Sequence, residues 1–462
     1  MRHWQAGFTD RIGKLKIIRR MAGHKFSGGV YLVGGALREV ALGHLPNDYD
    51  FALECPEDLK VIESIFNAAG FLLGKKPIQT HRIATGNLAV DITILDGSIR
   101  DDLLRRDFTI NAMAYDLARG RIIDLLGGRE DIERKIIRYP RRKSIEEDPL
   151  RMIKAMRHLS ALRGFRLDPE LKMAIAEDKR LIHRTAPERI KYEFDLIMAA
   201  PNPYGGIKVM AETGLLFEVF PELVPLGEMD REKGLELEVL GHTIGGFRYM
   251  NRIRKLHSFS VKENKYAGYG LLFHDLGKPQ TFSYDEEKER VHFFYHERHS
   301  RDIAIRIMER LRFSTSEMRV ILKIIENHMR IFLISNREAT EKATRRLVYK
   351  MEEMTPSLVF LTLLDLYGSS KGEENESTVQ VKDRCREVLD AYDEWRREPL
   401  PRIVSGYDLI ALGFQQGPAI GDVLDQIREK QISGEISRKE EALDYAEQRL
   451  GRWEGEKTDG CA

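Results

Sequence analysis

Short blocks of apolar and polar residues alternate over the first third of the chain and predict a mixed α/β region. Stretches rich in β-branched and aromatic residues between turn residues are typical of strands, whereas apolar residues three or four apart are typical of helices. The strand-like stretches are 28–35, 48–54, 81–95 and 120–128, and the helical ones are 62–71 and a segment that begins at 105–117. From Ser144 onward the strand signals fade and helical spacing dominates.

Breaks in composition divide the chain further. Pro- and Gly-rich stretches at 201–206 and 221–228 and a polar stretch at 369–378 interrupt the helical pattern. The predicted fold class is α+β, with a mixed β-sheet in an N-terminal head followed by an all-α neck, a second helical domain and a tail. The five expected segments are an amphipathic leader (1–26), the head (27–139), a helical neck or body (140–237), a helical, histidine-rich domain (238–370) and a helical tail (371–462).

Charge and cysteine content narrow the function classes. The 462 residues include 74 basic and 73 acidic ones, a net charge of +1, so any site for a polyanion must be a local patch. The three cysteines form no CxxC pair, which disfavours a disulfide framework or a cysteine zinc site. No apolar run approaches the roughly 20 residues of a membrane helix, and the N-terminus lacks the continuous apolar core of a signal peptide. We expect a cytoplasmic protein with no membrane partner.

The richest chemical signal lies between Val30 and Leu53. Gly34 and Gly35 separate a strand from a helix, where backbone N–H groups can approach a phosphate. Asp48 and Asp50 are two residues apart on the next strand, so both carboxylates point to one face and can hold a divalent metal such as Mg²⁺. The alternative for the pair is a solvated turn cap.

A neighbouring carboxylate extends this acidic group. Asp91 lies on a nearby expected strand, either as a third acidic group or as a strand-end carboxylate that faces solvent.

Three blocks, GGALRE…DYD, RRDFTINAMAYD (105–116) and EDPLRMIKAMRHLSALRGF (147–165), resemble the class II tRNA nucleotidyltransferase and bacterial poly(A) polymerase family. The family adds C and A nucleotides to RNA 3′ ends without a nucleic-acid template, so the resemblance implies a nucleotidyltransferase head and a tRNA partner. It implies Mg²⁺ binding and catalysis by Asp48 and Asp50. The implied nucleotide-binding residues of the head are Gly34, Gly35, Arg38, Arg106, Asp107 and Asn111. Glu39 departs from the aspartate that the family usually has there.

The third block implies a base template made of side chains. A carboxylate accepts from the amino group that cytosine and adenine share, and a guanidinium donates to their ring acceptors, so Asp148 and Arg151 can read both bases. Their spacing of three predicts one helical face. Two helix starts compete: Pro149 would make Asp148 an N-cap, whereas a Ser144–Glu147 capping box would leave Asp148 free for the base.

Two further cations follow on the same expected helix. Lys154 and Arg157 come about one and two turns after Arg151 and are nucleotide-binding candidates. Lys154 stands where the family usually has arginine, and lysine keeps the charge but loses the bidentate fork.

The interval 94–104 bears on which nucleotide is added. CCA-adding relatives carry a longer, flexible segment there, and the short interval resembles the CC-adding enzymes. This implies CTP as substrate and a separate A-adding enzyme that completes the CCA end. The alternatives are full CCA or A addition, an ATP-using poly(A) polymerase, a protein that is mainly a metal-dependent phosphohydrolase, and an inactive RNA-binding scaffold. An ordinary short connection would say nothing about specificity.

A second constellation lies in 238–370 and resembles the HD domain, whose signature is H…HD…D with extra histidines. Imidazole and carboxylate ligands suit a transition metal such as Mn, Ni, Co or Fe, which would acidify water for phosphoester hydrolysis. Such domains are sometimes hydrolytic and sometimes structural, and a lone helical histidine is more often packed than ligating. The candidate ligands are His242, His274, Asp275, His296, His328 and Asp365.

Overall fold

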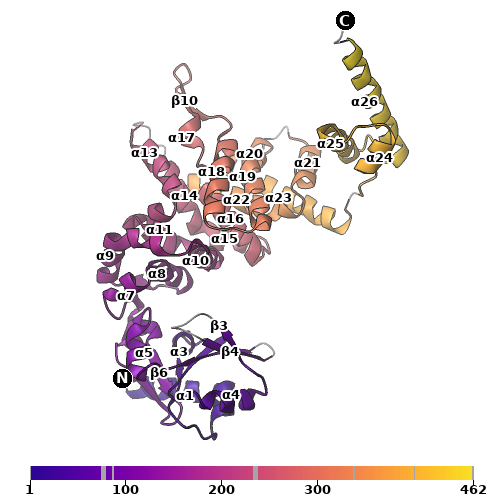
Figure 1. Ribbon diagram of the computed structural model, residues 1–462. Coiled ribbons are helices and arrows are strands. Elements are labelled where there is room, and N and C mark those ends of the chain that lie inside the picture. Colours follow the sequence, from indigo (N-terminus) through magenta and orange to yellow (C-terminus); the bar gives the residue numbers. More distant parts are fainter. Residues whose placement is uncertain are drawn as a thin grey trace. The chain divides into compact units, whose positions relative to one another are not determined.

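The computed structural model describes residues 2–73, 80–85, 88–232, 238–336, 339–399 and 401–459 (Figure 1). The chain forms two compact units, Met1–Pro221 and Glu222–Ala462. The first combines a β-sheet with helices, and the second is mainly helical. The predicted α+β class, with a mixed-sheet head and helical regions after it, is confirmed. Among the described residues, no helix is long and apolar enough to cross a membrane.

A mixed sheet of seven strands, in the order β3-β4-β5-β2-β1-β6-β7, forms the head. β2 pairs in parallel with β5 and antiparallel with β1, which is buried along its whole length. A short, continuous apolar run is what a strand covered on both faces requires. The strands are β1 (Val30–Val33), β2 (Asp48–Leu53), β3 (Phe71–Leu73), β4 (Thr80–Thr85), β5 (Leu88–Ile94), β6 (Met113–Asp116) and β7 (Arg121–Asp124).

The helix expected to begin at 105–117 is wrong. Helix α5 (Ile99–Arg105) ends there, a single 3-10 turn follows at Thr109–Asn111, and the next residues form β6 between β1 and β7. All four residues of β6 are buried, so apolar side chains fill both faces and leave no strand period in the sequence. The other head helices are α1 (Arg2–Gly13), α2 (Lys16–Met21), α3 (Gly35–Ala41), α4 (Asp58–Phe66) and α6 (Gly128–Arg134).

The neck consists of helices that pack on α8 (Arg151–Ala161). Helix α11 (Pro203–Thr213) approaches α8 so closely that a Cβ at Gly206 would lie 2.6 Å from the Met156 carbonyl oxygen, which requires glycine. Proline occupies the first position of three of these helices, where its missing N–H costs no hydrogen bond. The others are α7 (Lys143–Glu147), α9 (Pro169–Asp178), α10 (Pro187–Ala199) and α12 (Leu215–Val219), with a small parallel pair, β8 (Ile136–Ile137) and β9 (Arg166–Leu167).

The second unit is organised around α22 (Thr355–Ser369), which contacts α14, α16 and α23 and is buried over most of its length. Its helices up to α19 are α13 (Val224–Glu232), α14 (Val239–Gly246), α15 (Met250–Arg254), α16 (Val261–Phe273), α17 (Lys278–Thr281), α18 (His296–Arg310) and α19 (Thr315–Asn327). The remaining ones are α20 (Arg330–Leu333), α21 (Glu341–Met351), α23 (Glu376–Arg397), α24 (Gly406–Ala411), α25 (Pro418–Ile432) and α26 (Lys439–Asp459).

One feature of this unit departs from the all-helical expectation. Strands β10 (Phe282–Asp285) and β11 (Arg290–Phe293) form an antiparallel hairpin between α17 and α18 (Figure 1). The hairpin ends just before His296, one of the candidate metal ligands.

Candidate active site and metal centre

Gly34 lies directly against Asp50 at the end of β1. The register pairs Val33 with Asp50, and Gly34 has a φ of 76°. A Cβ at this position would be 2.8 Å from Asp50 Oδ2 and 3.0 Å from Arg106 Nη1. Glycine is therefore required both by the backbone conformation and by the space. A backbone turn, a carboxylate and a guanidinium meet at one point of the head.

Three carboxylates share this face of the sheet. Asp48 and Asp50 lie two residues apart on β2, and the parallel register places Asp91 of β5 beside Asp50. Burial raises the pKa of Asp50, Asp91 and Asp48 raise it further, and Arg106 acts in the opposite direction. Crowded carboxylates of this kind favour a cation, and oxygen ligands are those that Mg²⁺ prefers. The residues present thus fit a divalent metal.

Asp91 is partly buried, and a guanidinium pairs with it. Arg82 of β4 forms two hydrogen bonds with it, Nε to Oδ1 at 2.7 Å and Nη2 to Oδ2 at 2.6 Å. Asp48 and Asp50 therefore remain the carboxylates best placed to bind a metal, with Asp91 held beside them by a guanidinium.

A chain of hydrogen bonds connects the other head residues. Arg38 on α3 donates from Nη1 to Asn111 Oδ1 at 2.5 Å, and Asn111 Nδ2 donates to Asp107 Oδ1 at 3.0 Å. Arg38 also donates to Glu39 Oε1 from Nε and Nη2, at 3.1 and 2.8 Å. Burial raises the pKa of Glu39, but Arg38 and His44 outweigh it and the net shift is downward. Glu39 therefore stays ionised and orients Arg38.

The expected helical face shared by Asp148 and Arg151 is wrong. Asp148 has an extended backbone (φ −143°) between α7 and α8, and α8 begins only at Arg151. Neither predicted cap forms, because Leu150 precedes α8 without a side-chain hydrogen bond and Ser144 lies inside α7. A proline-containing turn that is too tight to continue α7 separates the two residues into different elements.

Each residue of the proposed template is held by a different partner. Asp148 accepts from Arg189 Nη2 at 3.2 Å on both carboxylate oxygens. Arg151 donates to the carbonyl oxygens of Arg105 at 2.6 Å and Ser144 at 3.3 Å. Sequence reasoning missed Arg189, which lies on α10, because a pairing over 41 positions leaves no local signal.

Lys154 and Arg157 lie on α8 and face acidic groups. Arg157 Nε is 3.4 Å from Oε2 of the buried Glu193, whose pKa is raised by burial and lowered in part by Arg157. Burial acts to raise the pKa of Asp107, but His158 and Lys154 outweigh it and the pKa falls. The positive charge of Lys154 on α8 therefore stabilises the ionised carboxylate of Asp107 in the head.

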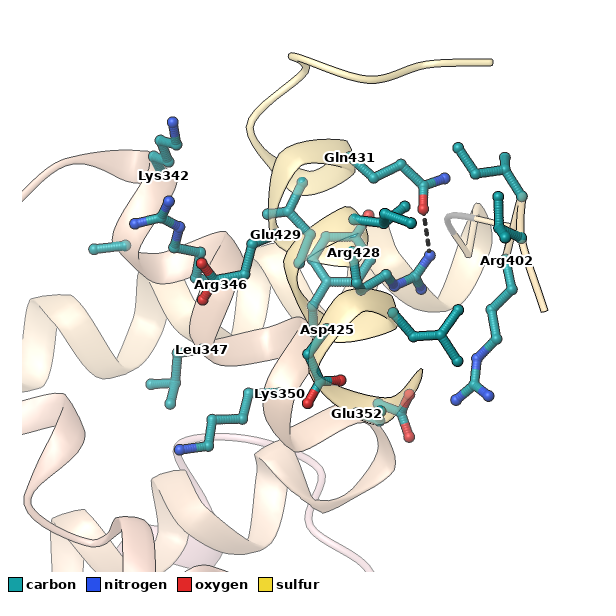
Figure 2. A pocket seen from close by; sticks show the side chains of 18 of the residues that line it. Lys342, Arg346, Leu347, Lys350, Glu352, Arg402, Asp425, Arg428, Glu429 and Gln431 are labelled. Atoms are coloured by element: carbon teal, nitrogen blue, oxygen red, sulfur yellow. Dashed lines mark hydrogen bonds between the residues drawn. The ribbon is translucent and has the colours of Figure 1, made fainter. Parts of the chain in front are cut away.

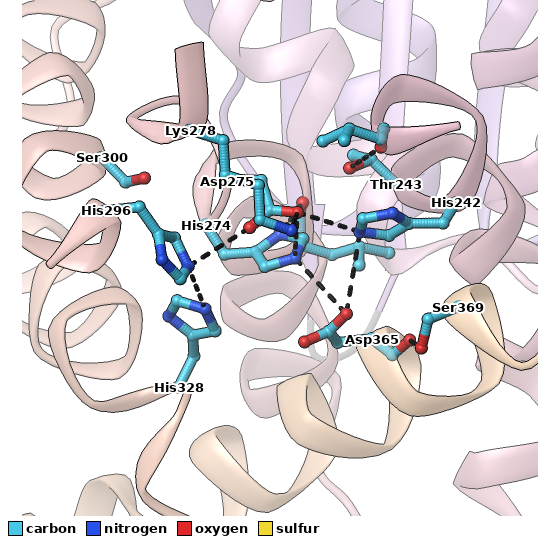
Figure 3. A network of polar contacts seen from close by, with 12 residues as sticks. His242, Thr243, His274, Asp275, Lys278, His296, Ser300, His328, Asp365 and Ser369 are labelled. Carbon is cyan, nitrogen blue, oxygen red and sulfur yellow. Dashed lines mark hydrogen bonds and ion pairs between the residues drawn. The ribbon is translucent and has the colours of Figure 1, made fainter. Parts of the chain in front are cut away.

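The six histidine and aspartate candidates of the second unit converge (Figure 3). His242 comes from α14, His274 and Asp275 follow α16, and Asp365 comes from α22. Asp275 is central: its Oδ2 lies 3.0 Å from His242 Nε2 and 3.2 Å from His274 Nε2, and its Oδ1 lies 3.4 Å from His296 Nε2. Asp365 Oδ1 is 3.5 Å from His274 Nε2 and 3.7 Å from His242 Nε2.

Three of the histidines donate from the same ring nitrogen. His274, His296 and His328 each place Nδ1 2.7 to 2.8 Å from the carbonyl oxygen three residues earlier, so Nδ1 carries a proton, and in a neutral ring Nε2 presents a lone pair. His296 Nε2 and His328 Nε2 are 3.1 Å apart. Burial lowers the pKa of His328 to about 3 and also lowers that of His296, so both rings are neutral. Two facing lone pairs are favourable only with a cation between them, which fits a transition metal.

The carboxylates of the cluster also favour a positive charge on His274. Burial acts to lower the pKa of His274, but Asp275 and Asp365 outweigh it and raise this pKa to about 10. Lys278 Nζ lies 2.7 Å from Asp275 Oδ2. Asp275 Oδ1 is buried without a hydrogen-bond donor. A proton on His274 therefore offsets the negative charge of the buried carboxylates of Asp275 and Asp365. A bound metal would supply this positive charge in place of the proton.

Family models match three parts of the chain. They describe a poly A polymerase head domain at residues 30–138, a probable RNA and SrmB-binding site of polymerase A at 164–226 and an HD domain at 239–368. Head and HD domains of these kinds usually bind divalent metals, and the described histidine and aspartate groups provide candidate ligands in the second unit.

Full-length relatives carry related names. The CC-adding tRNA nucleotidyltransferase of Thermus thermophilus is 30% identical over 419 residues, covering 89% of this chain and 91% of the relative. The A-adding tRNA nucleotidyltransferase of Deinococcus radiodurans is 29% identical over 452 residues, covering 94% and 98%. The fold is similar to that of the Thermotoga maritima CCA-adding enzyme solved with tRNA (TM-score 0.60, 20% identity, 96% of this chain and 98% of that one). This chain belongs to the CCA-adding class of tRNA nucleotidyltransferases.

Proposed function

We propose that the protein adds the two cytidine residues of the CCA end to tRNA, using CTP. The observation that carries the proposal is the tight connection between β5, which ends at Ile94, and α5, which begins at Ile99. Leu95 N donates to Leu53 O at 2.8 Å, and Ser98 forms a capping box with Asp101. A connection fixed at both ends leaves no flexible segment between Ile94 and Ile99 that could widen the pocket from a pyrimidine to a purine. The Thermus thermophilus relative, named CC-adding, supports the same assignment.

In the proposed reaction the tRNA 3′ hydroxyl attacks the α-phosphate of CTP in line, and pyrophosphate leaves. Asp48 and Asp50 would hold Mg²⁺, which when bound would assist the attack and the departure of pyrophosphate. The turn at Gly34 brings backbone close to the triphosphate, and Arg106 supplies positive charge there. Arg38, fixed by Glu39 and Asn111, adds a second cation.

Cytosine binding requires the template residues to exchange partners. The cytosine amino group would replace Arg189 at Asp148, and the ring acceptors would replace the two backbone carbonyls at Arg151. Both side chains stay satisfied without nucleotide, so neither is a buried unpaired charge. Uracil and guanine present the opposite donor and acceptor order, and they would leave both side chains unpaired.

The direct test offers tRNA that ends at the discriminator base, after C or after CC, with CTP or ATP alone. We expect two C additions, one C addition and none, respectively, with no A addition to any substrate. Efficient A addition to the CC-ended tRNA would contradict the proposed specificity. The A-adding activity of the Deinococcus radiodurans relative makes A addition the main alternative. If the proposal holds, a separate A-adding enzyme completes the end.

A second proposed function rests on the facing Nε2 lone pairs of His296 and His328. We propose that the HD cluster binds a transition metal, Mn, Ni, Co or Fe, through His242, His274, Asp275, His296, His328 and Asp365, and hydrolyses phosphoesters. The test measures bound metal by elemental analysis and cleavage of a 2′,3′-cyclic phosphate. His274→Ala should lose both the metal and the cleavage, while His257→Ala, outside the cluster, should keep both. Cleavage that survives His274→Ala would refute the hydrolase assignment.

A further inference from the structure

A concave, strongly basic pocket lies in the second unit, apart from the histidine–aspartate cluster (Figure 2). Its volume is about 990 Å³, at the upper end of the range for small-molecule sites. Seven lysine and arginine residues line it against three acidic ones, in a chain whose total charge is only +1. This excess of four positive charges is a local patch in an almost neutral protein.

Three of these cations form one stripe along α21. Lys342, Arg346 and Lys350 are four residues apart, so they lie on the same face of the helix. Like charges at this spacing destabilise a helix, because each pair repels across one turn. Lys342 forms an ion pair with Glu435, with 3.6 Å between Nζ and Oε1, whereas no carboxylate among the described residues forms an ion pair with Arg346 or Lys350.

Other elements bring more cations to the same concavity. Lys323 comes from α19, Arg330 begins α20, and Arg402 precedes α24. Among the described residues, no carboxylate forms an ion pair with these three or with Lys350. Burial lowers the pKa of Lys350 and repulsion from Arg330 and Lys323 lowers it further, while Glu326 acts in the opposite direction. A bound anion would relieve this repulsion.

The pocket also has features suited to the non-phosphate part of a ligand. The guanidinium of Arg428 on α25 lies 5.2 Å from the centre of the Tyr349 ring, and both residues line the pocket. Apolar side chains such as Leu347 and Ile427 contribute to its wall. The cations line a cavity of about 990 Å³, which has room for a short, dense polyanion, whereas an extended single strand of RNA follows an open groove.

We propose that this pocket, which we call the α21–α25 pocket, binds a phosphate chain, either as a nucleoside polyphosphate or as an inorganic polyphosphate. The site is additional to the triphosphate site of the head and to the HD cluster. It does not depend on which nucleotide the enzyme adds.

The test is calorimetric titration of the full-length protein with inorganic tripolyphosphate, pyrophosphate and CTP, in EDTA. Arg346→Gln/Lys350→Gln should weaken tripolyphosphate binding at least tenfold, because two charge-assisted contacts are lost. The matched control is Arg345→Gln: Arg345 lies on the same helix but pairs with Glu341 and is absent from the pocket lining. It should stay within twofold of wild type. Tighter binding of CTP than of tripolyphosphate, lost in the double variant, would identify a nucleotide; equal binding would identify the phosphate chain alone.

A thermal-shift measurement guards against misfolding. Tripolyphosphate should raise the Tm of wild type and of Arg345→Gln more than that of the double variant. If the double variant does not fold, Lys350→Gln is tested with the same readouts. Equal binding by all variants, or no tripolyphosphate binding by wild type, would overturn the proposal. Loss of tRNA affinity alone in the double variant would also overturn it, since the pocket would then bind RNA phosphates.

Discussion

Replacing Gly34 with alanine tests whether the close approach at Asp50 matters for nucleotide transfer. The substitution has two costs. The backbone φ of 76° is unfavourable for alanine, which costs about 1–3 kcal/mol of folding free energy. The new Cβ would also lie 2.8 Å from Asp50 Oδ2, so the carboxylate must move by roughly half an ångström to restore an ordinary contact. Such a displacement at the metal-binding group should lower the transfer rate about 10- to 100-fold.

Gly43→Ala separates the two costs. Gly43 has a φ of 87°, but nothing lies within 4 Å of a Cβ placed there. In denaturant titrations Gly43→Ala should lose only the free energy of the unfavourable backbone conformation and Gly34→Ala should lose at least as much, while only Gly34→Ala should lose kcat for CMP addition at saturating CTP and tRNA. If both variants keep equal kcat, or lose it equally, then the contact with Asp50 does not set the geometry of the reaction.

Three further predictions concern the charged sites. Asp50→Asn should abolish transfer yet raise the free energy of unfolding at pH 7. A carboxyl whose pKa is raised in the folded state destabilises the fold once the pH exceeds the pKa of the unfolded state, and the amide removes that penalty. Denaturant titrations should show the gain at pH 7 and not at pH 4, and a loss of stability at pH 7 would contradict the prediction. Asp148→Asn replaces an acceptor with a donor and should lower the preference for CTP over UTP about 100-fold in competition assays. Because the ion pair with Arg189 is half-exposed, its loss should change the free energy of unfolding by less than about 1 kcal/mol. An unchanged preference for CTP would show that Asp148 does not read the base. His328→Ala should abolish the increase in Tm that Mn²⁺ or Co²⁺ causes in the wild type. In the wild type this increase should shrink as the pH falls, because protons compete with the metal for the ligand nitrogens. An increase in Tm that does not depend on pH would mean that the metal binds elsewhere.

Local patterns predicted much of the head. The strands at 28–35 and 48–54 contain β1 and β2, and Gly34 and Gly35 lie between β1 and the body of α3, as the strand–glycine–helix order predicted. These features could be predicted because each depends on neighbouring residues: side-chain alternation along a strand, and the space that glycine leaves.

Contacts over long sequence distances could not be predicted in this way. Arg82 holds Asp91 and Arg189 holds Asp148, and each pairing depends on which elements the fold brings together. Strand β6 was missed because burial on both faces removes the strand period. The convergence of the HD ligands was expected from the family resemblance, since no local spacing joins residues from three helices and from the ends of two others.

The parallel register between β2 and β5 constrains how such an enzyme can evolve. A slip of one residue would turn Asp48 and Asp50 to the opposite face, so these proposed metal ligands cannot be adjusted by small steps. Asp148 and Arg151, by contrast, lie at a turn and at the first residue of a helix, where single substitutions leave the sheet intact. Changes of nucleotide preference should therefore accumulate around the template and the β5–α5 connection while the chemistry stays fixed. An ancestral enzyme could pass its tRNA-extending reaction to descendants that divide the CCA sequence between them.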